Sequence, residues 1–156
     1  MARSRRHFLI GSACCAAGAG AASLLGAAAA RATPEAMLEA IRHIVGEAEL
    51  RPGRVTLDLP PLVENGNAVP VGIAVDSPMS EADHVRAIHL FNEKNPQPQV
   101  ISVTLGPRCG RAALQTRIKL ADSQRVVAIA EMSDGSFWTA EASAIVTIAA
   151  CVEDLL

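Results

Sequence analysis

The first regular hydrophobic pattern lies at residues 34–48, where apolar side chains recur at the three- and four-residue spacing of an α-helix. The apolar positions are Met37, Leu38, Ile41, Ile44, Val45 and Ala48, and the opposite side carries Glu39, Arg42 and Glu47. Thr33 is suited to cap the first turn, and Pro34 is suited to the first helical position. The pattern predicts an amphipathic helix over residues 34–48 that packs on a sheet and is ended by Arg51-Pro52-Gly53.

From residue 55 onward the spacing of apolar residues changes from helical to alternating. Short apolar runs predict strands at residues 55–59, 69–75, 85–91, 100–105, 114–120, 126–131, 137–139 and 144–148. Turn-forming residues separate these runs, and Asp134-Gly135 is typical of a hairpin turn. Many short strands at nearly regular spacing predict an all-β fold, an antiparallel β-sandwich with an N-terminal helix.

The predicted core consists of apolar residues that alternate along these strands. We expect burial of Val69, Val71, Ile73, Val75, Phe91, Ile118, Leu120, Val127 and Ile129. No internal repeat or linker divides residues 33–156, so they are expected to form one domain around a single core.

Residues 1–32 have the pattern of an export signal. Arg5 and Arg6 form a twin-arginine pair, an Ala- and Gly-rich apolar segment follows at residues 8–30, and Ala30-Arg31-Ala32 has the small-x-small form of a cleavage site. The paired arginines favour the Tat pathway and predict a periplasmic location. A retained membrane anchor is the weaker alternative, because alanine and glycine partition poorly into lipid.

Removal of this segment would make the chain more acidic. The full chain has a formal net charge of −2 at pH 7, from 14 Lys and Arg against 16 Asp and Glu. Four of the basic residues and none of the acidic ones lie in residues 1–32, which leaves a net charge of −6. We therefore expect no nucleic-acid partner, and no membrane association after signal cleavage, because both call for a basic surface.

The histidines and the absence of known catalytic motifs argue against a metal centre or an enzyme. His84 and His89 are separated by an odd number of residues, which places them on opposite faces of a strand. The sequence contains no Cys-x-x-Cys, no phosphate-binding glycine loop and no Gly-x-Ser-x-Gly elbow. We predict no metal site, and an enzyme is the weakest of the functional hypotheses.

Two cysteines remain once Cys14 and Cys15 leave with the signal. Cys151 lies just past the apolar run 144–148, so we expect it on a short tail, where a thiol is exposed and can reach partners. Cys109 lies in a turn-like stretch with arginines nearby, and positive neighbours make a thiol more reactive. The residues alone leave a Cys109–Cys151 disulfide and two free thiols as equal alternatives.

Three long segments resemble stretches of the SoxY family. Glu64–Val71 is similar to the family's ENGNTVPV, Val75–Val85 to its VDSPMTEADYV, and Ala87–Pro96 to its IHIFAEKNP. Residues 116–121, 126–136 and 146–148 continue the match in the same order. The resemblance covers nearly the whole of residues 33–156, together with the twin-arginine signal.

The resemblance implies an immunoglobulin-like β-sandwich that carries sulfur in thiosulfate oxidation and is not itself an enzyme. It implies a heterodimer with a second sandwich subunit, SoxZ. The partner enzymes it implies are the haem complex SoxAX, which couples thiosulfate to the carrier cysteine, the hydrolase SoxB, which releases sulfate, and in some organisms the dehydrogenase SoxCD. By position after the last strand, the carrier cysteine is Cys151, with a covalent thiosulfate or sulfane adduct in place of a cofactor.

The tail departs from the family pattern at this cysteine. Family members end in Gly-Gly-Cys-Gly-Gly, whereas residues 149–156 read AACVEDLL. Alanine restricts φ and the residues beyond the cysteine are bulky, so this arm is expected to be stiffer. Cys109, where relatives are expected to carry serine, is a candidate resolving or disulfide thiol. The alternative to a carrier loaded on Cys151 is a non-catalytic binding or structural paralogue, with Cys109 and Cys151 disulfide-bonded or idle.

Overall fold

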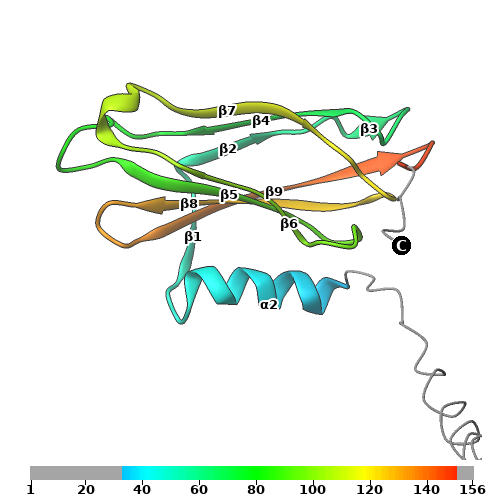
Figure 1. Cartoon of the computed structure of the whole chain (residues 1–156), viewed down its shortest axis with the longest axis horizontal. Coiled ribbons are helices and arrows are strands. Elements are labelled where there is room, and N and C mark those ends of the chain that lie inside the picture. Colours follow the sequence, from blue (N-terminus) through cyan, green and yellow to red (C-terminus); the bar gives the residue numbers. More distant parts are fainter. Residues whose placement is uncertain (1–32, 151–156) are drawn as a thin grey trace, which may run out of the picture. The chain divides into compact units, whose positions relative to one another are not determined.

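The computed structural model describes residues 33–150. They form three layers: a three-stranded sheet, a six-stranded sheet and a helix beneath the six-stranded sheet (Figure 1). The elements are α2 (Pro34–Val45), β1 (Leu50–Pro52), β2 (Val55–Asp58), β3 (Leu62–Val63), β4 (Val69–Val75), β5 (Val85–Asn92), β6 (Gln99–Thr104), the 3-10 turn η1 (Pro107–Cys109), β7 (Ala112–Ile118), β8 (Gln124–Met132) and β9 (Phe137–Val146). The order is β2-β4-β7 in one sheet and β1-β9-β8-β5-β6 in the other, where β3 also pairs with β9.

Helix α2 begins and ends at residues suited to those positions. The Thr33 hydroxyl accepts a hydrogen bond from the N–H of Ala36 at 3.3 Å, and Pro34 opens the first turn. Gly46 takes a positive φ of 63°, and its N–H donates to the carbonyl of Arg42 at 2.8 Å. The predicted helix was three residues too long because a glycine in this conformation ends an α-helix.

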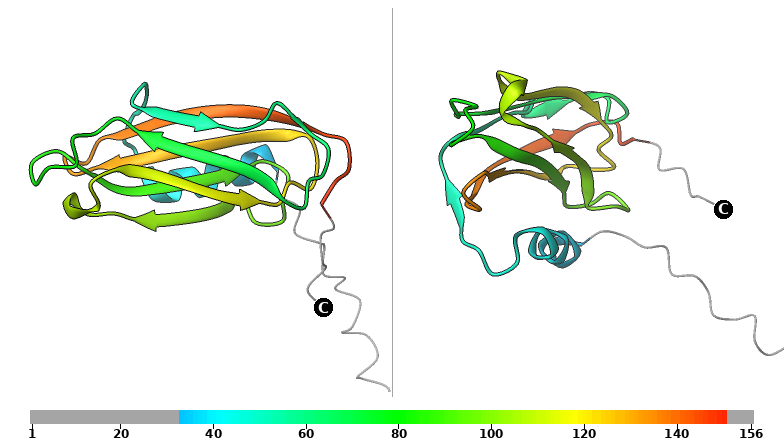
Figure 2. Two further views of the ribbon diagram at one scale, coloured as in Figure 1. Left: turned by 90° about the horizontal axis from the view of Figure 1, so that it is seen from above. Right: turned by 60° about the vertical axis from the view of Figure 1, so that its left-hand side comes forward.

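One face of α2 packs on the outer side of the six-stranded sheet, as the end-on view shows (Figure 2). The two surfaces consist of Met37, Ile41 and Val45 from the helix and Phe91, Val127, Ile129 and Phe137 from the sheet. The other faces of β5 and β8 belong to the sandwich interior, so both strands are buried on both sides. This arrangement confirms the predicted all-β sandwich with an N-terminal helix.

The predicted core is confirmed, because all nine residues expected to be buried are less than 9% exposed. Leu38, which was expected in the apolar stripe of the helix, is instead 43% exposed. No helix within residues 33–150 has the length and apolar character needed to span a membrane.

Strand β9 differs most from the sequence prediction. The runs predicted at residues 137–139 and 144–148 belong to one continuous strand. Ala140–Ser143 between them are weak strand formers, but they pair with β8 and so continue the strand. The short strands β1 and β3 were not predicted, and both pair with β9 in parallel. The larger sheet is therefore antiparallel apart from these two edge pairings.

His89 is a buried titratable residue on the helix-facing side of β5. Its Nδ1 lies 2.7 Å from the hydroxyl of Ser102 on β6, and its Nε2 is buried without a hydrogen-bond partner among the described residues. Burial lowers the pKa of His89 from its ordinary value of 6.5, and the nearby Glu131 carboxylate opposes this shift. The fold therefore favours the neutral imidazole.

The depressed pKa predicts that the protein loses stability as the pH falls through about 6.5, because the unfolded chain then binds a proton that the folded chain does not. His89→Gln should remove this part of the pH dependence. Urea unfolding at about pH 7.5 and about pH 5.5 measures it, and the wild-type protein should lose more free energy of unfolding than the variant. An equal loss in both proteins would contradict the assignment.

Candidate functional site

The end of β9 leads toward Cys151 and is fixed by the parallel strand β3. The backbone N–H of Thr147 donates to the carbonyl of Val63 at 2.9 Å. The Thr147 hydroxyl donates to the carbonyl of Glu64 at 3.1 Å. Thr147 thus continues the pairing with the β3 segment beyond Val146, where β9 ends.

Gly66 then joins this chain end to the three-stranded side of the sandwich. Its N–H donates to the carbonyl of Ile148 at 2.8 Å. Its carbonyl accepts from the N–H of Leu120 at 2.8 Å, and the carbonyl of Leu120 accepts from the N–H of Ala150 at 3.0 Å. We call this set of backbone contacts, made by Gly66, Leu120, Ile148 and Ala150, the Gly66 clasp. Ala150, the residue before Cys151, is buried.

The clasp has room only for glycine at position 66. An added Cβ would fall well inside contact distance of the Leu120 carbonyl oxygen and 2.8 Å from the Ala150 nitrogen. The turn that presents Gly66 is shaped by Asn65, whose side-chain oxygen accepts from the N–H of Asn67 at 2.9 Å. The close approach of three backbone segments is therefore the reason for a glycine here.

The loop that carries Leu120 is held by the side chain of Asn95. Its Nδ2 donates to the carbonyl of Lys119 at 2.8 Å, and its Oδ1 accepts from the N–H of Ala121 at 3.0 Å. The side chain of Gln124 donates to the same Oδ1 at 2.8 Å. Asn95 thus fixes the backbone on both sides of Leu120 and supports the clasp from outside.

An ion pair adds to this support. The Lys94 ammonium lies 2.9 Å from Asp122 Oδ2. This hydrogen bond from Lys94, together with one from the N–H of Ser123, holds the pKa of Asp122 below its ordinary value. Both side chains are exposed, so the pair contributes little to stability and serves to orient the loop.

The predicted site residues fall into two groups. Cys151, Arg5 and Arg6 lie outside the described residues. Cys109 lies in η1, where its side chain is exposed and its Sγ accepts from the N–H of Gly106 at 3.5 Å, and it has no disulfide partner within residues 33–150. The end of β9 and η1 lie at opposite ends of the sandwich (Figures 1 and 2).

Metal-ligating residues do not gather in the described chain. His84 precedes β5 and places its Nδ1 3.0 Å from the carbonyl of Ser80, whereas His89 lies within β5. Between residues 33 and 150, no group of three or more His, Cys, Asp or Glu side chains is placed to hold a metal ion. For the whole chain, the absence of a metal site stays a prediction.

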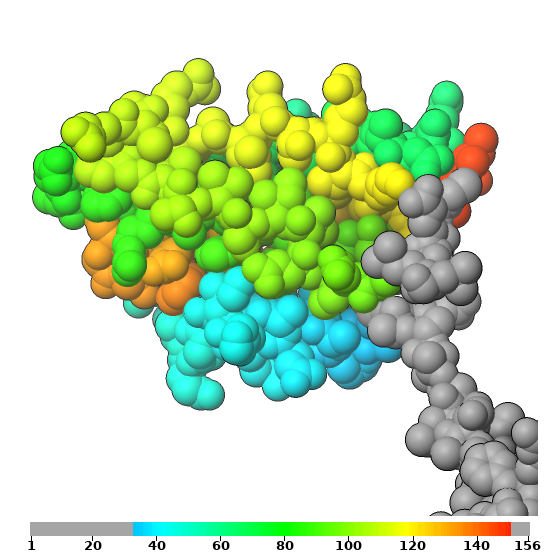
Figure 3. Space-filling model, viewed as in Figure 1, coloured from blue at the N-terminus to red at the C-terminus, as the bar shows by residue number. Residues whose placement is uncertain are grey.

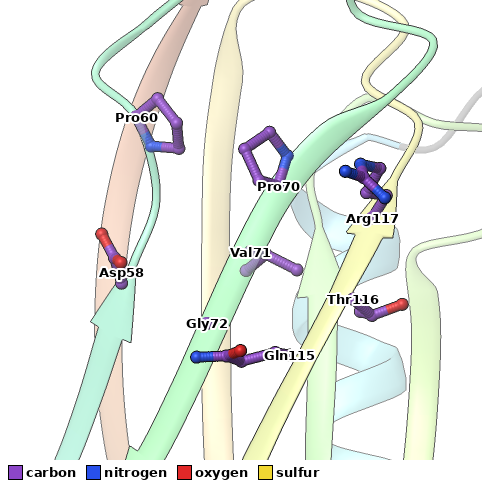
Figure 4. A pocket seen from close by; sticks show the side chains of 8 residues that line it. All are labelled: Asp58, Pro60, Pro70, Val71, Gly72, Gln115, Thr116 and Arg117. Carbon is purple, nitrogen blue, oxygen red and sulfur yellow. The ribbon is translucent and has the colours of Figure 1, made fainter.

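A shallow groove of about 650 Å³ lies on the outer face of the three-stranded sheet (Figure 4). Its lining residues are Asp58, Pro60, Pro70, Val71, Gly72, Gln115, Thr116 and Arg117. The groove forms because Pro70 and Gly72 project no long side chain from the central strand β4. Its lining contains neither a thiol nor a histidine, so we assign it no part in cysteine chemistry.

Sequence reasoning missed the structural roles of Gly66 and Asn95. Both residues were visible as turn signals, in Asn65-Gly66-Asn67 and in Asn95-Pro96, and both lie in segments that carry the family resemblance. No sequence signal indicated that the two segments meet around Leu120. They meet next to Ala150, the residue that precedes Cys151 in the sequence.

Comparison with family models gives one match. The model described as "Sulfur oxidation protein SoxY" matches residues 41–151, a range that ends at Cys151. No curated protein matches the sequence.

Solved structures share the fold. The sulfur carrier protein SoxY from Chlorobium limicola f thiosulfatophilum is 25% identical, with a TM-score of 0.61 over 72% of this chain and 96% of that chain. A superoxide reductase (neelaredoxin) from Ignicoccus hospitalis is 19% identical, with a TM-score of 0.53 over 74% of this chain and 94% of that chain. The second likeness shows the fold alone.

Replacing Gly66 with alanine should open the clasp, because the new methyl group collides with backbone atoms of Leu120 and Ala150, which must then shift. We expect Gly66→Ala to lower the free energy of unfolding by about 1–3 kcal/mol and to speed amide hydrogen exchange at Leu120 and Ala150. Gly106→Ala is the matched control, since a Cβ there meets no atom within 4 Å and the φ of Gly106 is −139°. Equal exchange rates at Ala150 in both variants would contradict the role given to Gly66.

Proposed function

The chain belongs to the SoxY family of sulfur oxidation proteins, and we propose that it is the carrier that holds thiosulfate-derived sulfur on the thiol of Cys151. The observation that carries the proposal is the Gly66 clasp, which fixes Ala150 directly before this cysteine. A thiol that follows a fixed residue, rather than lying within a strand, is able to enter the active site of another protein. In this proposal the sandwich is the rigid part of the carrier, and the residues after Ala150 present the thiol to partner enzymes.

The proposed chemistry needs partner enzymes, because the loading step is an oxidation. A bond forms between Cys151 Sγ and the sulfane sulfur of thiosulfate, the thiol releases its proton, and two electrons pass to a haem enzyme of the SoxAX kind. Hydrolysis of the adduct by a SoxB-like enzyme adds water across the S–S bond to the sulfonate. That step releases sulfate and two protons and leaves a persulfide on Cys151, which a SoxCD-like enzyme oxidises where one is present.

The charges beside the thiol support dependence on a partner. Glu153 and Asp154 follow Cys151 closely, and negative charge disfavours a thiolate and repels anionic thiosulfate. Salt should screen the repulsion. A partner enzyme that supplies positive charge would overcome both effects, so spontaneous loading should be slow.

The position of Cys109 supports two free thiols over the disulfide alternative. Cys109 precedes β7 and Leu120 follows it, and the extended strand Ala112–Ile118 alone spans about 20 Å. Ala150 is bound to Leu120, and neighbouring Cα atoms are about 3.8 Å apart. A Cys109–Cys151 disulfide, which needs Cα atoms within about 7 Å, would therefore require the clasp to open.

The proposal also covers the cellular location of the protein and its partner subunit. Residues 1–32 act as a Tat signal through Arg5 and Arg6, and the carrier works in the periplasm as residues 33–156. A SoxZ-like subunit pairs with it, which fits the unpaired outer edges that β6, β2 and β7 present within the described sheets.

Cys151→Ser should abolish loading and leave the fold intact, because the residue lies beyond the clasp. Cys109→Ser should load like the wild-type protein. Both variants are incubated with thiosulfate and the partner haem enzyme, and the adduct is measured by mass spectrometry. An adduct that persists in Cys151→Ser would place the chemistry elsewhere. Loss of loading in Cys109→Ser would indicate a resolving thiol.

The chain should form a complex with a SoxZ-like subunit from the same cell. Light scattering after size-exclusion chromatography, on the chain alone and on the mixture, measures this. We expect a 1:1 heterodimer, and self-association of the isolated chain through its open strand edges. A chain that stays monomeric in both samples would remove the proposed partnership.

A further inference from the structure

Large apolar side chains are exposed at the end of β9. Leu62 is 59% exposed, Ile145 is 61% exposed and Ile148 is 65% exposed. Leu62 and Ile145 are direct partners in the β3–β9 pairing, so they lie side by side, and Ile148 follows Ile145 by three residues. We call these three residues the apolar patch. Figure 3 shows this end of β9, in red, at the surface next to the blue-green segment around β3.

The patch interrupts the polar surface of the six-stranded sheet beyond α2. Phe137, at the start of β9, packs against the helix, and every second residue after it lies on the same face of the sheet. On this face Glu141 and Ser143 are exposed and polar, whereas Ile145 is exposed and apolar. Single exposed apolar residues are ordinary, but an apolar pair on an outer strand, where charge is usual, indicates a surface that a partner covers.

The patch lies close to the point from which the carrier cysteine extends. The carbonyl of Ile148 accepts a hydrogen bond within the Gly66 clasp, and Ala150 directly precedes Cys151 in the sequence. Five residues separate Ile145 from Ala150, so their Cα atoms are at most about 18 Å apart. An interface of ordinary size, about 800 Å² on each side, is roughly 30 Å across. A protein that takes Cys151 into its active site therefore also meets the patch.

The charges next to the patch favour a partner with a basic rim. Arg125 on β8 pairs with Ser143, the outward-facing residue before the patch on β9. Arg125 is shared between two carboxylates, because its Nη1 lies 3.4 Å from Glu141 and its Nη2 lies 3.5 Å from Glu93. One positive charge against two negative charges leaves this group acidic, and Glu64, which follows β3, adds a further negative charge. A complementary surface is apolar at its centre and basic around it.

We propose that the apolar patch is the docking surface for the redox enzyme that loads Cys151, and that this enzyme meets the patch with an apolar centre and a basic rim. The inference rests on the proposed function, because it names the surface through which the carrier meets its loading enzyme. Basic residues around the active site of that enzyme would also attract anionic thiosulfate. One distribution of charge thus serves both the carrier and the substrate.

A transient enzyme fits the patch better than a permanent subunit or a second copy. Stable interfaces take about 20–30 residues on each side, whereas redox encounters use the smallest areas, which suits three large apolar residues. A second copy in a twofold dimer would bring the acidic surroundings of the patch against themselves, and like charges that face each other disfavour association. The open strand edges elsewhere in the described sheets remain for a SoxZ-like subunit.

The test measures binding of the loading enzyme to a full chain that is unable to react. The Cys151→Ser chain is titrated with the haem enzyme, and association is followed by biolayer interferometry. In this background, Leu62→Gln/Ile145→Gln should raise Kd about tenfold, because it removes the apolar centre of the contact. Ile148→Gln, which leaves the β3–β9 pair intact, should weaken binding as well. The association rate of the parent chain should fall as ionic strength rises, since the rim contact is electrostatic.

Leu62→Ile/Ile145→Val is the matched control, because both positions stay apolar, and it should bind like the parent chain. Both double variants should keep the parent's urea-unfolding midpoint, since the two side chains are exposed. Equal Kd values in the glutamine variant and the control, or no binding of the enzyme to the parent chain, would overturn the proposal. Weaker pairing with a SoxZ-like subunit, or weaker self-association, at unchanged enzyme affinity would also overturn it and assign the patch to that other occupant.

This result is separate from that of the sulfur-loading experiment. Binding of the Cys151→Ser chain needs neither thiosulfate nor a reactive thiol. An enzyme that binds through the patch, while Cys151 of the wild-type chain never accepts sulfur, would leave the docking surface standing and remove the carrier function. Loading of Cys151 at the same KM for the wild-type chain and the glutamine variant would do the reverse.

Discussion

The close approach of backbone at Gly66 is the constraint on which the functional end of this protein depends. The chain leaves the six-stranded sheet after β9 and reaches the three-stranded sheet only because position 66 carries no side chain. Leu120, which is fully buried, closes the interior at the same point, and Asn95 holds the loop on both sides of it. The end of the sandwich and the chain up to Ala150 are thus held by the same backbone hydrogen bonds.

Sequence patterns predicted the parts of the fold that rest on local alternation. Strand β4 was predicted at its observed bounds, because every second residue from Val69 to Val75 is buried. The middle of β9 was not predicted, since Ala140–Ser143 are strand residues only by virtue of pairing with β8. The clasp was beyond sequence reasoning because it joins three segments far apart in the chain. For the same reason, the sequence left a Cys109–Cys151 disulfide and two free thiols as equal alternatives; in the structure, β7 separates Cys109 from Leu120.

The fold by itself does not indicate the function. Superoxide reductases share the sandwich at under 25% identity, and this likeness carries no chemistry to the present chain. The family match extends to Cys151 and makes the chain one of the sulfur-oxidation carriers. In this chain, Cys151 is followed by Val152-Glu153-Asp154-Leu155-Leu156.

The parallel pairing of β1 and β3 with β9 has a consequence for how the protein is made. Both strands lie early in the domain, yet their hydrogen-bonding partner is translated most of a domain later. Loop closure over such a separation is slow, and on the ribosome it must wait until β9 has left the exit tunnel. A polypeptide that ends before β9 lacks this strand as well as Cys151, which follows it in the sequence. Only chains that are long enough to complete β9 therefore carry Cys151, so completion of the sandwich and the presence of this thiol coincide.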